Sequence, residues 1–391
     1  MALVFHWFLP TNGDSRYLTA GEFAAPGAAV GYRDTTVRYL SRIAGAAEQL
    51  GFVSALTPTG YWCDDAWIVT AMLTQVTDRL KFLVALRPGL MSPTLAAQMV
   101  ATFQQMSKGR LLVNVVAGGE SSEAQGYGDF LNKDGRYGRT AEFLKIVRAL
   151  WRGEAVDAEG MYLSVRGAQL SRLPEPVPDI YCAGSSAAAG PVAAELADVY
   201  LTWAELPGQV EEKIAWIAGL ARQCGRKLRF GMRLNVITRD TASQAWAEAE
   251  RLINAIDPDV MRAVQEGLSR SESVGQQRLV SLHKGDMSRL EIYPNLWAGV
   301  GLARGGAGTA FVGSHSEVAD RIVEYHQLGI EEFIFSGYPH LEEVYWFGEG
   351  VLPILRKRGL WHHPYEDVSN SLSNARFTVA GGVPRSSDDK A

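Results

Sequence analysis

Two arginines, a tyrosine, a histidine and an asparagine occupy positions from which they could converge on a small oxyanion. Arg233 and Asn235 are two residues apart in an apolar stretch that is typical of a strand, so they share one face of it. Arg304 lies in a glycine run, and Tyr338 and His340 share a turn after another predicted strand. A guanidinium group suits bidentate binding of sulfonate, phosphate or carboxylate, and a cation in a barrel mouth is costly without an anion. Composition alone does not choose among these anions.

Four more polar side chains lie inside or after predicted strands. Cys63 stands between a turn and a helix start, so it is either a small buried hydrophobe or a thiol with a lowered pKa. Asn114 lies inside an apolar strand, where its amide could bind the edge of a ligand ring as well as the backbone. Ser185 and Ser186 open a helix, where hydroxyls and free N–H groups suit a phosphate but could also form a plain N-cap.

Short apolar runs alternate with longer segments of helical periodicity, and these elements must position the side chains above. The predicted strands span residues 3–8, 53–56, 81–86, 111–116, 180–183, 199–202, 227–238 and 332–335. The predicted helices include residues 36–50, 94–106, 140–151, 209–224 and 316–328. Eight strands, each followed by a helix, predict an α/β protein with a closed (β/α)8 TIM barrel in preference to an open doubly wound sheet. Residues just after the strands form the active face of such a barrel.

Two segments fall outside the repeat of strand and helix. Residues 241 to about 310 are helix-rich and end in the glycine run 299–308, which predicts a long, lid-like insertion before the eighth strand. From about residue 362 the chain is polar and loop-like, as in a frayed terminus or an arm that reaches a neighbouring subunit. We therefore expect one barrel domain over residues 1–361 and a polar C-terminal tail over 362–391.

The composition excludes several classes of protein. The 391 residues carry 38 Lys and Arg against 43 Asp and Glu, for a formal charge of −5, and the chain has no basic block, so no nucleic-acid partner is expected. Cys63, Cys182 and Cys224 form neither a disulfide set nor a CxxC pair, which indicates a reducing compartment and no zinc-ribbon or other metal site. No uncharged apolar run approaches the roughly 18 residues of a membrane helix, and the N-terminus lacks a basic signal-peptide start. We expect a soluble, cytoplasmic protein.

Eight short segments, spread from residue 3 to about 355, carry the pattern of a known family. They are His6–Thr11, Pro58–Cys63, Lys81–Pro88, Gly184–Ser186, Tyr200–Trp203, Pro294–Leu302, Arg304–Thr309 and Phe335–Glu343. On these segments the chain resembles the bacterial-luciferase-like two-component flavin monooxygenases. The last three segments, PNLWAGVGL, RGGAGT and FSGYPHLEE, resemble the alkanesulfonate monooxygenase subfamily in particular.

The resemblance implies a TIM barrel that takes reduced FMN from a separate NAD(P)H-dependent flavin reductase and reacts it with O₂. The resulting peroxyflavin would cleave the C–S bond of a small-molecule organosulfonate and give an aldehyde and sulfite. Because the family forms dimers and tetramers, the resemblance also implies a homo-oligomer, with no nucleic-acid or membrane partner.

The same resemblance implies a role for each candidate side chain. The implied catalytic residues are Arg233, Arg304, Tyr338 and Cys63. The implied substrate-binding residues are Trp203, Asn235, His340 and again Arg304. The implied FMN-binding residues are Asn114, Tyr137, Ser185 and Ser186. Tyr137 belongs to the segment Arg136–Arg139, which resembles the family's Arg-Tyr helix start near the phosphate and departs from it at the final Arg.

The chain also departs from the family at position 235. The family has His there, in the motif Arg-Leu-His-Val-Ile, whereas Asn235 cannot exchange a proton near neutral pH. Tyr338, Arg233 or water would then carry the proton transfer, or position 235 would only orient the substrate. Tyr61 and Trp62 are bulkier than the residues usual in the family. These changes indicate a substrate other than a simple linear alkanesulfonate.

Three interpretations follow. The first is a reduced-FMN-dependent desulfonating monooxygenase that acts on an alkanesulfonate or on a bulkier hydroxylated sulfonate such as sulfoquinovose. The second keeps the flavin chemistry and acts on a sulfone or another non-sulfonate. The third is a flavin-binding protein that has lost catalysis. A deazaflavin-dependent oxidoreductase is disfavoured by the three subfamily segments.

Overall fold

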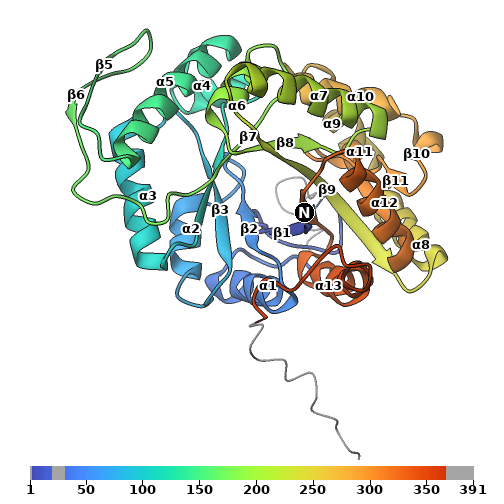
Figure 1. The fold of residues 1–391 in the computed structure, drawn as a ribbon. Coiled ribbons are helices and arrows are strands. Elements are labelled where there is room, and N and C mark those ends of the chain that lie inside the picture. Colours follow the sequence, from blue (N-terminus) through green and yellow to red (C-terminus); the bar gives the residue numbers. More distant parts are fainter. Residues whose placement is uncertain (1, 20–30, 367–391) are drawn as a thin grey trace, which may run out of the picture.

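The eight apolar runs of the sequence form eight parallel strands that close into a barrel (Figure 1). The protein is seen here as a computed structural model, which describes residues 2–19 and 31–366. The barrel strands are β1 (Val4–Phe8), β2 (Ser54–Thr57), β3 (Lys81–Leu86), β4 (Leu111–Val115), β7 (Ile180–Ala183), β8 (Val199–Trp203), β9 (Arg229–Arg239) and β13 (Glu332–Ser336). Each pairs with the next in this order, and β13 pairs with β1 to close the barrel. The predicted (β/α)8 TIM barrel is confirmed.

Helices surround the barrel and connect its strands (Figure 1). The connecting helices are α1 (Val37–Leu50), α2 (Ala66–Leu73), α3 (Pro93–Ser107), α4 (Ser121–Gly126), α5 (Lys133–Trp151), α6 (Ala189–Leu196), α7 (Pro207–Gln223), α12 (His315–Gln327) and α13 (His340–Lys357). The segment between α5 and β7 also forms a hairpin of β5 (Val156–Glu159) and β6 (Ser164–Ala168). The prediction that α5 begins at residue 140 was wrong by seven residues. The helix begins after Asn132, whose side chain caps it, and runs through Gly135 and Gly138, which disfavour a helix in sequence reasoning.

Side chains at alternate strand positions fill the barrel in layers. At the amino ends of the strands, a polar floor joins His6, Ser54, Tyr181, Arg229 and Glu332. One step along the strands lies an apolar layer that includes Phe8, Leu56, Leu83, Leu112, Leu201 and Ile334. The next inward positions belong to Asn114, Trp203 and Arg233, which line a cavity. Because strand side chains alternate between the two faces, residues two apart in the sequence stand in successive layers.

The outward-facing residues of the strands hold the last helix against the barrel. Phe5 and Phe335 pack against Phe347 of α13, with ring centroids 5.5 and 4.7 Å away, respectively. Full burial of one such ring contributes about 1.5–3 kcal/mol relative to exposure. This packing fixes the start of α13, which carries His340, at the carboxyl end of β13.

The predicted insertion is present, and it ends in a strand that the sequence pattern did not predict. It contains α8 (Ala242–Asn254), α9 (Pro258–Ser269), α10 (Val274–His283), the 3₁₀ helix η2 (Met287–Arg289), β10 (Glu291–Tyr293), β11 (Leu296–Trp297), α11 (Val300–Ala303) and β12 (Ala310–Ser314). Asn235 of β9 pairs with β12 and with β13, so these two strands lie on opposite edges of β9. Residues 231–233 pair with β8 and β13, so β12 continues the edge begun by β8. Sequence reasoning missed this strand because the run of glycines before β12 is typical of a loop.

Within the described ranges, none of the helices is both long enough and apolar enough to span a membrane. The predicted tail begins at residue 362, and all of it beyond residue 366 lies outside the described residues. The division into a barrel domain and a tail therefore stays a prediction.

Candidate active site

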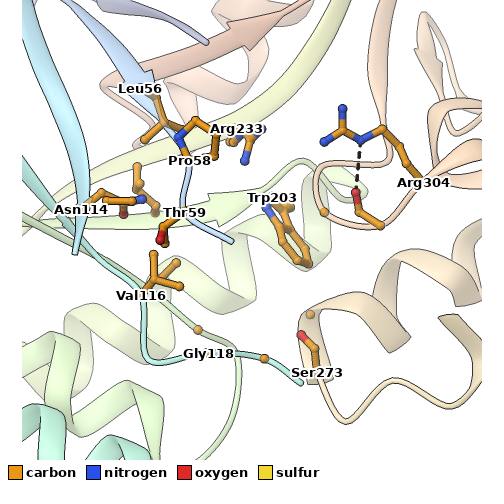
Figure 2. Close-up of a pocket in the computed structure, with 18 of the residues that line it drawn as sticks. Leu56, Pro58, Thr59, Asn114, Val116, Gly118, Trp203, Arg233, Ser273 and Arg304 are labelled. Carbon is orange, nitrogen blue, oxygen red and sulfur yellow. Dashed lines mark hydrogen bonds between the residues drawn. The ribbon is translucent and has the colours of Figure 1, made fainter. Parts of the chain in front are cut away.

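A cavity of about 460 Å³ lies at the carboxyl ends of the barrel strands (Figure 2). Of the eleven predicted site residues, nine line it: Asn114, Tyr137, Ser185, Ser186, Trp203, Arg233, Arg304, Tyr338 and His340. Cys63 and Asn235 are not among the lining residues. The structure thus gathers side chains from seven separate parts of the sequence around one space, as expected for the active face of a TIM barrel.

Arg233 stands at the inner wall of this cavity without an anionic partner among the described residues. Its guanidinium carbon lies 4.4 Å from the centre of the Phe8 ring, and its Nε is buried without a hydrogen-bond partner. Burial and the nearby charge of Arg304 lower the pKa of Arg233 to about 9. An arginine pKa falls this far only where its charge is poorly compensated, so the site favours an anionic ligand.

Arg304 and Tyr338 meet at the same end of the cavity. Nη1 of Arg304 donates a hydrogen bond to the Tyr338 hydroxyl, and its Nε lies 3.5 Å from the carbonyl oxygen of Gly305. In Figure 2 the guanidinium group of Arg304 extends toward the space beside Trp203 and Arg233. Two guanidinium groups and a phenol therefore offer hydrogen-bond donors from different directions to one oxyanion.

The lining as a whole is cationic. It contains Lys133, Lys213, Arg233 and Arg304, whereas no Asp or Glu is found among the lining residues of the described chain. The charge of Lys213 is neutralised within the protein, because its Nζ donates to Glu205 Oε1 at 2.6 Å. The charges of the two arginines are not offset in this way, so the cavity attracts anions.

Another part of the lining, after β7, is built for close approach of the backbone. Gly184 directly follows β7 with φ +140°, and a Cβ there would lie 2.6 Å from the Tyr137 hydroxyl oxygen and 2.5 Å from Cβ of Ala189. Only glycine fits this position, which leaves Ser185 and Ser186 facing the cavity beside Tyr137. The Ser186 hydroxyl also accepts a hydrogen bond from the Ala189 amide at 3.3 Å, as an N-cap would.

The phenol beside this turn keeps its proton. Burial and the neighbouring Cys182 raise the pKa of Tyr137. A phenol, two hydroxyls and the turn amides together make a set of neutral donors suited to a phosphate group.

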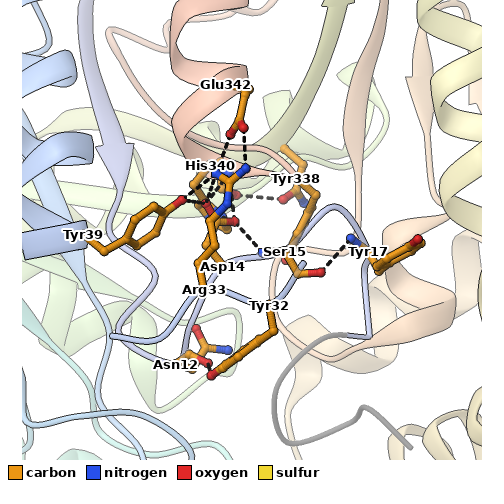
Figure 3. A network of polar contacts seen from close by, with 12 residues as sticks. Asn12, Asp14, Ser15, Tyr17, Tyr32, Arg33, Tyr39, Tyr338, His340 and Glu342 are labelled. Carbon is orange, nitrogen blue, oxygen red and sulfur yellow. Dashed lines mark hydrogen bonds and ion pairs between the residues drawn. The ribbon is translucent and has the colours of Figure 1, made fainter. Parts of the chain in front are cut away.

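His340 forms the wall beside Tyr338, and its ring lies 5.1 Å from the Tyr338 ring between centroids. Nδ1 of His340 lies 3.0 Å from Oδ1 of the buried Asp14, which also accepts a hydrogen bond from the His340 amide (Figure 3). Tyr39 donates to the other oxygen of Asp14, and Arg33 bridges from this network to Glu342. The remaining ring nitrogen of His340, Nε2, is buried without a hydrogen-bond partner.

Cys63 lies behind the cavity wall as a half-buried thiol. Its Sγ donates to the carbonyl oxygen of Gly60 at 3.5 Å. Burial raises the pKa of Cys63 to about 11, so the thiol is protonated at neutral pH. Of the two readings of this cysteine, the structure favours the protonated, packed thiol.

Asn235 is buried, and its amide makes hydrogen bonds within the protein on both sides. Nδ2 donates to the carbonyl oxygens of Ala307 and Thr309 at 2.8 and 3.1 Å. Oδ1 accepts a hydrogen bond of 2.7 Å from the Ser336 hydroxyl. The amide thereby ties β9 and β13 to the glycine run that carries Arg304. This bridge uses the two N–H donors and the oxygen acceptor of the Asn235 side chain.

Sequence reasoning missed several lining residues. The segment after β1 contributes Asn12, Gly13, Ser15, Tyr17 and Leu18, and the insertion contributes Ser273, Val274 and Gly275. The signal for the first group was its place directly after a strand, where the active face of a barrel lies. The insertion gave no such signal, because its side chains reach the cavity only through its fold.

Two segments of the insertion, residues 273–275 and 304–306, line the cavity and are tied to their surroundings. The amide of Gly306 donates to the side chain of Gln276 at 2.9 Å, which ties the Arg304 loop to α10. Lys133 of α5 donates to the carbonyl oxygen of Glu272 at 2.9 Å, which ties the start of α10 to the barrel.

The cationic cavity lies at the carboxyl face of a TIM barrel, the face at which enzymes of this fold carry their active sites. The chain matches the luciferase-like monooxygenase family over residues 3–332 and belongs to that family.

Three solved structures share the fold. Riboflavin lyase with modified FMN and its substrate riboflavin has a TM-score of 0.79 at 21% identity, and the match covers 94% of each chain. Long-chain alkane monooxygenase has a TM-score of 0.75 at 20% identity, again with 94% of each chain covered. EDTA monooxygenase from Chelativorans sp. BNC1 has a TM-score of 0.72 at 18% identity, with 94% of this chain and 96% of that chain covered.

Proposed function

We propose that this protein is an FMNH₂-dependent organosulfonate monooxygenase, which uses O₂ to cleave a C–S bond and releases an aldehyde and sulfite. The substrate is an alkanesulfonate or a bulkier hydroxylated sulfonate such as sulfoquinovose. The observation that carries the proposal is the meeting of Arg233 and Arg304 at one end of a cavity whose described lining has no carboxylate.

A sulfonate suits this end of the cavity for electrostatic reasons. It carries one negative charge over three oxygens, which matches the unpartnered Nε of Arg233 and the N–H groups of Arg304 not bonded to Tyr338. The same cations would stabilise the negative charge that grows on the sulfur oxygens as sulfite leaves. Trp203 and Tyr17 add aromatic surface for the carbon part of the substrate.

The lining after β7 supports the assignment of an FMN site. Ser185, Ser186 and Tyr137 would bind the phosphate, and Asn114 would bind the edge of the ring system. The glycine at position 184 supports this assignment, because a Cβ there would close the space next to the Tyr137 hydroxyl. Reduced FMN bound here would supply the activation of O₂.

Two further parts of the proposal concern partners. Reduced FMN would come from a separate NAD(P)H-dependent reductase in the cytoplasm, and the chain would act as a homodimer or tetramer. The resemblance of the subfamily segments supports both expectations. Sedimentation of the purified protein tests the oligomeric state, and a run with the reductase omitted tests the need for it.

The experiment is sulfite release by the purified protein with FMN, NADPH and a flavin reductase. The panel runs from methanesulfonate through longer alkanesulfonates to sulfoquinovose, with a dialkyl sulfone added. We expect sulfite from a subset of the sulfonates. Turnover of the sulfone alone would replace the proposal with a sulfone monooxygenase, and peroxide formation without any product would indicate a flavin-binding protein that lacks catalysis.

Arg304→Ala tests in the same assay whether this arginine binds the sulfonate, and Arg262→Ala is the control variant. Arg262 lies on α9 of the same insertion, and its side chain is 67% exposed. We expect Arg304→Ala to abolish most sulfite release while Arg262→Ala leaves it unchanged. Equal loss in both variants would mean that the insertion was disturbed as a whole and that Arg304 has no special part in binding.

A further inference from the structure

Asp14 is a buried carboxylate behind the cavity wall, and it contacts His340 at two places. Its Oδ1 lies 2.9 Å from the backbone amide nitrogen of His340 and 3.0 Å from Nδ1 of the ring (Figure 3). The Ser15 amide donates to Oδ1 at 2.8 Å, and the Tyr39 hydroxyl donates to Oδ2 at 2.5 Å. These donors fix the carboxylate, and through it the imidazole ring.

These contacts decide which ring nitrogen carries the proton. Burial opposes ionisation of Asp14, but His340 and Tyr39 hold its pKa below the usual value, so it is a carboxylate at neutral pH. A carboxylate only accepts hydrogen bonds, so Nδ1 of His340 must donate, and a neutral ring then has its lone pair on Nε2. His340 lines the cavity, and Nε2 has no partner among the described residues.

We propose that Asp14 is a positioning residue that fixes His340 with Nε2 as the proton acceptor of the active site. The amide of Asn235 is engaged with the backbone and with Ser336, so position 235 offers no proton acceptor to the cavity. His340 is the one imidazole among the lining residues of the described chain. The reaction assigned to it rests on the proposed function.

The proton transfer belongs to the step that breaks the C–S bond. When bound, reduced FMN would supply the two electrons for oxygenation by O₂: one oxygen atom replaces a C–H bond by a hydroxyl group on the carbon that bears the sulfonate, and the other oxygen atom leaves as water while the flavin is oxidised. The hydroxyl proton passes to Nε2 of His340, and the O–H electron pair forms the C=O bond of the aldehyde. The C–S bond breaks, and its electron pair leaves with sulfur as sulfite. Asp14 stabilises the imidazolium formed in this step.

Asp14 is the counter-ion of the His340 ring, because the other carboxylates nearby are already paired. The other charged or titratable groups nearby are Tyr39 and Arg33 from the side of α1, Glu342 and Glu343 from α13, and Tyr338, Arg304 and Arg233 from the cavity. The two glutamates are already paired, Glu342 with Arg33 and Glu343 with Arg239. Among the described carboxylates, Asp14 is the one in contact with the imidazole.

A purely structural role for Asp14 predicts different results. Because Asp14 accepts the His340 amide, it also satisfies a free N–H at the start of α13. A side chain that only caps this helix would affect stability and leave the tautomer of the ring and the pH profile unchanged. The test therefore needs a readout of the ring itself.

The first measurement is ¹⁵N NMR of the ring nitrogens in histidine-labelled protein, without substrate. The His340 signals are assigned by their loss in His340→Gln. We expect a protonated Nδ1 and an unprotonated Nε2 in the wild type. Asp14→Ala should abolish this preference, and Tyr39→Phe, which removes one hydrogen bond from Asp14 and none from His340, should retain it. A wild-type ring protonated on Nε2 would overturn the proposal whatever the activity.

The second measurement is the pH profile of sulfite release. Asp14→Ala should lower kcat by about 10²–10⁴-fold, as does loss of a general base, with a KM close to that of the wild type. Asp14→Asn retains an oxygen that can accept the three N–H groups but lacks the charge. It should fold, keep the tautomer and shift the acid limb of kcat to lower pH by about one to three units.

The outcomes separate this proposal from the proposed function. If the wild type releases no sulfite but His340 is protonated on Nδ1, the proposed function fails and the positioning role stands. If the wild type releases sulfite and folded Asp14→Asn has the wild-type pH profile, Asp14 is a helix cap and the positioning role fails. The Asn variant decides the question even if Asp14→Ala does not fold.

Discussion

His6 and His340 are both buried beside a carboxylate, at opposite ends of one barrel, and they differ in the fate of the second ring nitrogen. His6 uses both nitrogens within the protein, with Nδ1 2.7 Å from the Ser54 hydroxyl and Nε2 3.0 Å from Glu332. His340 uses Nδ1 on Asp14 and has no partner for Nε2. A fully paired network stabilises a barrel, whereas a buried polar atom left without a partner, in a residue that lines a cavity, calls for a functional explanation.

Two arginines of β9 repeat this contrast. Arg229 at the floor is 39% exposed and lies 2.5 Å from Asp179 and 2.8 Å from Glu332. Arg233, four residues further along the same face, is half-buried in the cavity wall and has no carboxylate partner in the described structure. Stability alone would favour pairing both cations. The opposite arrangement indicates that the partner of Arg233 is a ligand.

The largest loss of stability should come from disrupting the polar floor of the barrel. Glu332→Ala removes the acceptor shared by His6 and Tyr181 and the partner of Arg229. We expect the free energy of unfolding to fall by about 3–5 kcal/mol, as for loss of one partner from a buried charge network. Urea denaturation of Glu332→Ala and Glu332→Gln measures this, and the Gln variant, which keeps a hydrogen-bonding side chain, should lose less. An unchanged midpoint for the Ala variant would mean that the floor network contributes nothing.

Arg233→Ala should lower the activity without lowering the stability, which is the converse of Glu332→Ala. Loss of one charged donor at the reacting group should lower kcat/KM for the sulfonate by about 10²–10³-fold. The denaturation midpoint should stay level or rise, because the variant removes a buried charge that has no partner in the described protein. Steady-state kinetics and urea denaturation of the same preparation test both halves. A lower midpoint with unchanged kinetics would assign Arg233 to the fold.

A smaller effect is expected from Asn235→Ala, which loosens the link between the two regions. The carbonyl oxygen of Ala307 and the hydroxyl of Ser336 would lose their partner. We expect a loss of about 1–3 kcal/mol in the free energy of unfolding. KM should rise more than kcat falls, since the loop that carries Arg304 is less fixed. Ser336→Ala, which removes one of these hydrogen bonds, should give a weaker version of both changes; a fall in kcat alone would instead place Asn235 at the reacting group.

The smallest predicted effect is a pH dependence of sulfonate binding. An anion favours the charged form of Arg233, so the pKa of this group is higher in the complex than the value of about 9 in the free protein. Affinity is therefore complete below pH 9 and falls above it, by at most about tenfold per pH unit. Titration of tryptophan fluorescence from pH 7 to 10 measures this. A neutral sulfone should show no such fall, and an equal fall for both ligands would point to a general change in the protein.

The sequence was sufficient to predict the barrel because its strands are short, apolar and punctuated by capped helices. Every predicted strand ends within two residues of the observed one. Six of the nine lining candidates could be assigned to the cavity for the same reason, since the carboxyl ends of barrel strands share one face; they are Asn114, Ser185, Ser186, Arg233, Tyr338 and His340. Arg304 came from the glycine run, and Tyr137 and Trp203 came from the family resemblance. A strand pattern thus predicts which side chains meet, without any knowledge of the distances between them.

Three features could not be predicted from the same reasoning. Asn235 and Arg233 share a face of β9, but β12 and the glycine run fold over Asn235 and take its amide. The low-polarity setting of Cys63 depends on packing that no local pattern contains. Asp14 is 326 residues from His340 in the sequence, so their pairing follows from barrel closure alone.

The two ends of the cavity come from different stretches of the gene. The lining near Ser185 and Tyr137 belongs to α5 and to the turn after β7, whereas Arg304 and its neighbours come from the insertion before β13. Mutations in the insertion can therefore alter what is accepted at the arginine end while the other end keeps its sequence. Substrate range can diversify in such a protein by drift and recombination in one contiguous segment, with the rest of the barrel under separate selection.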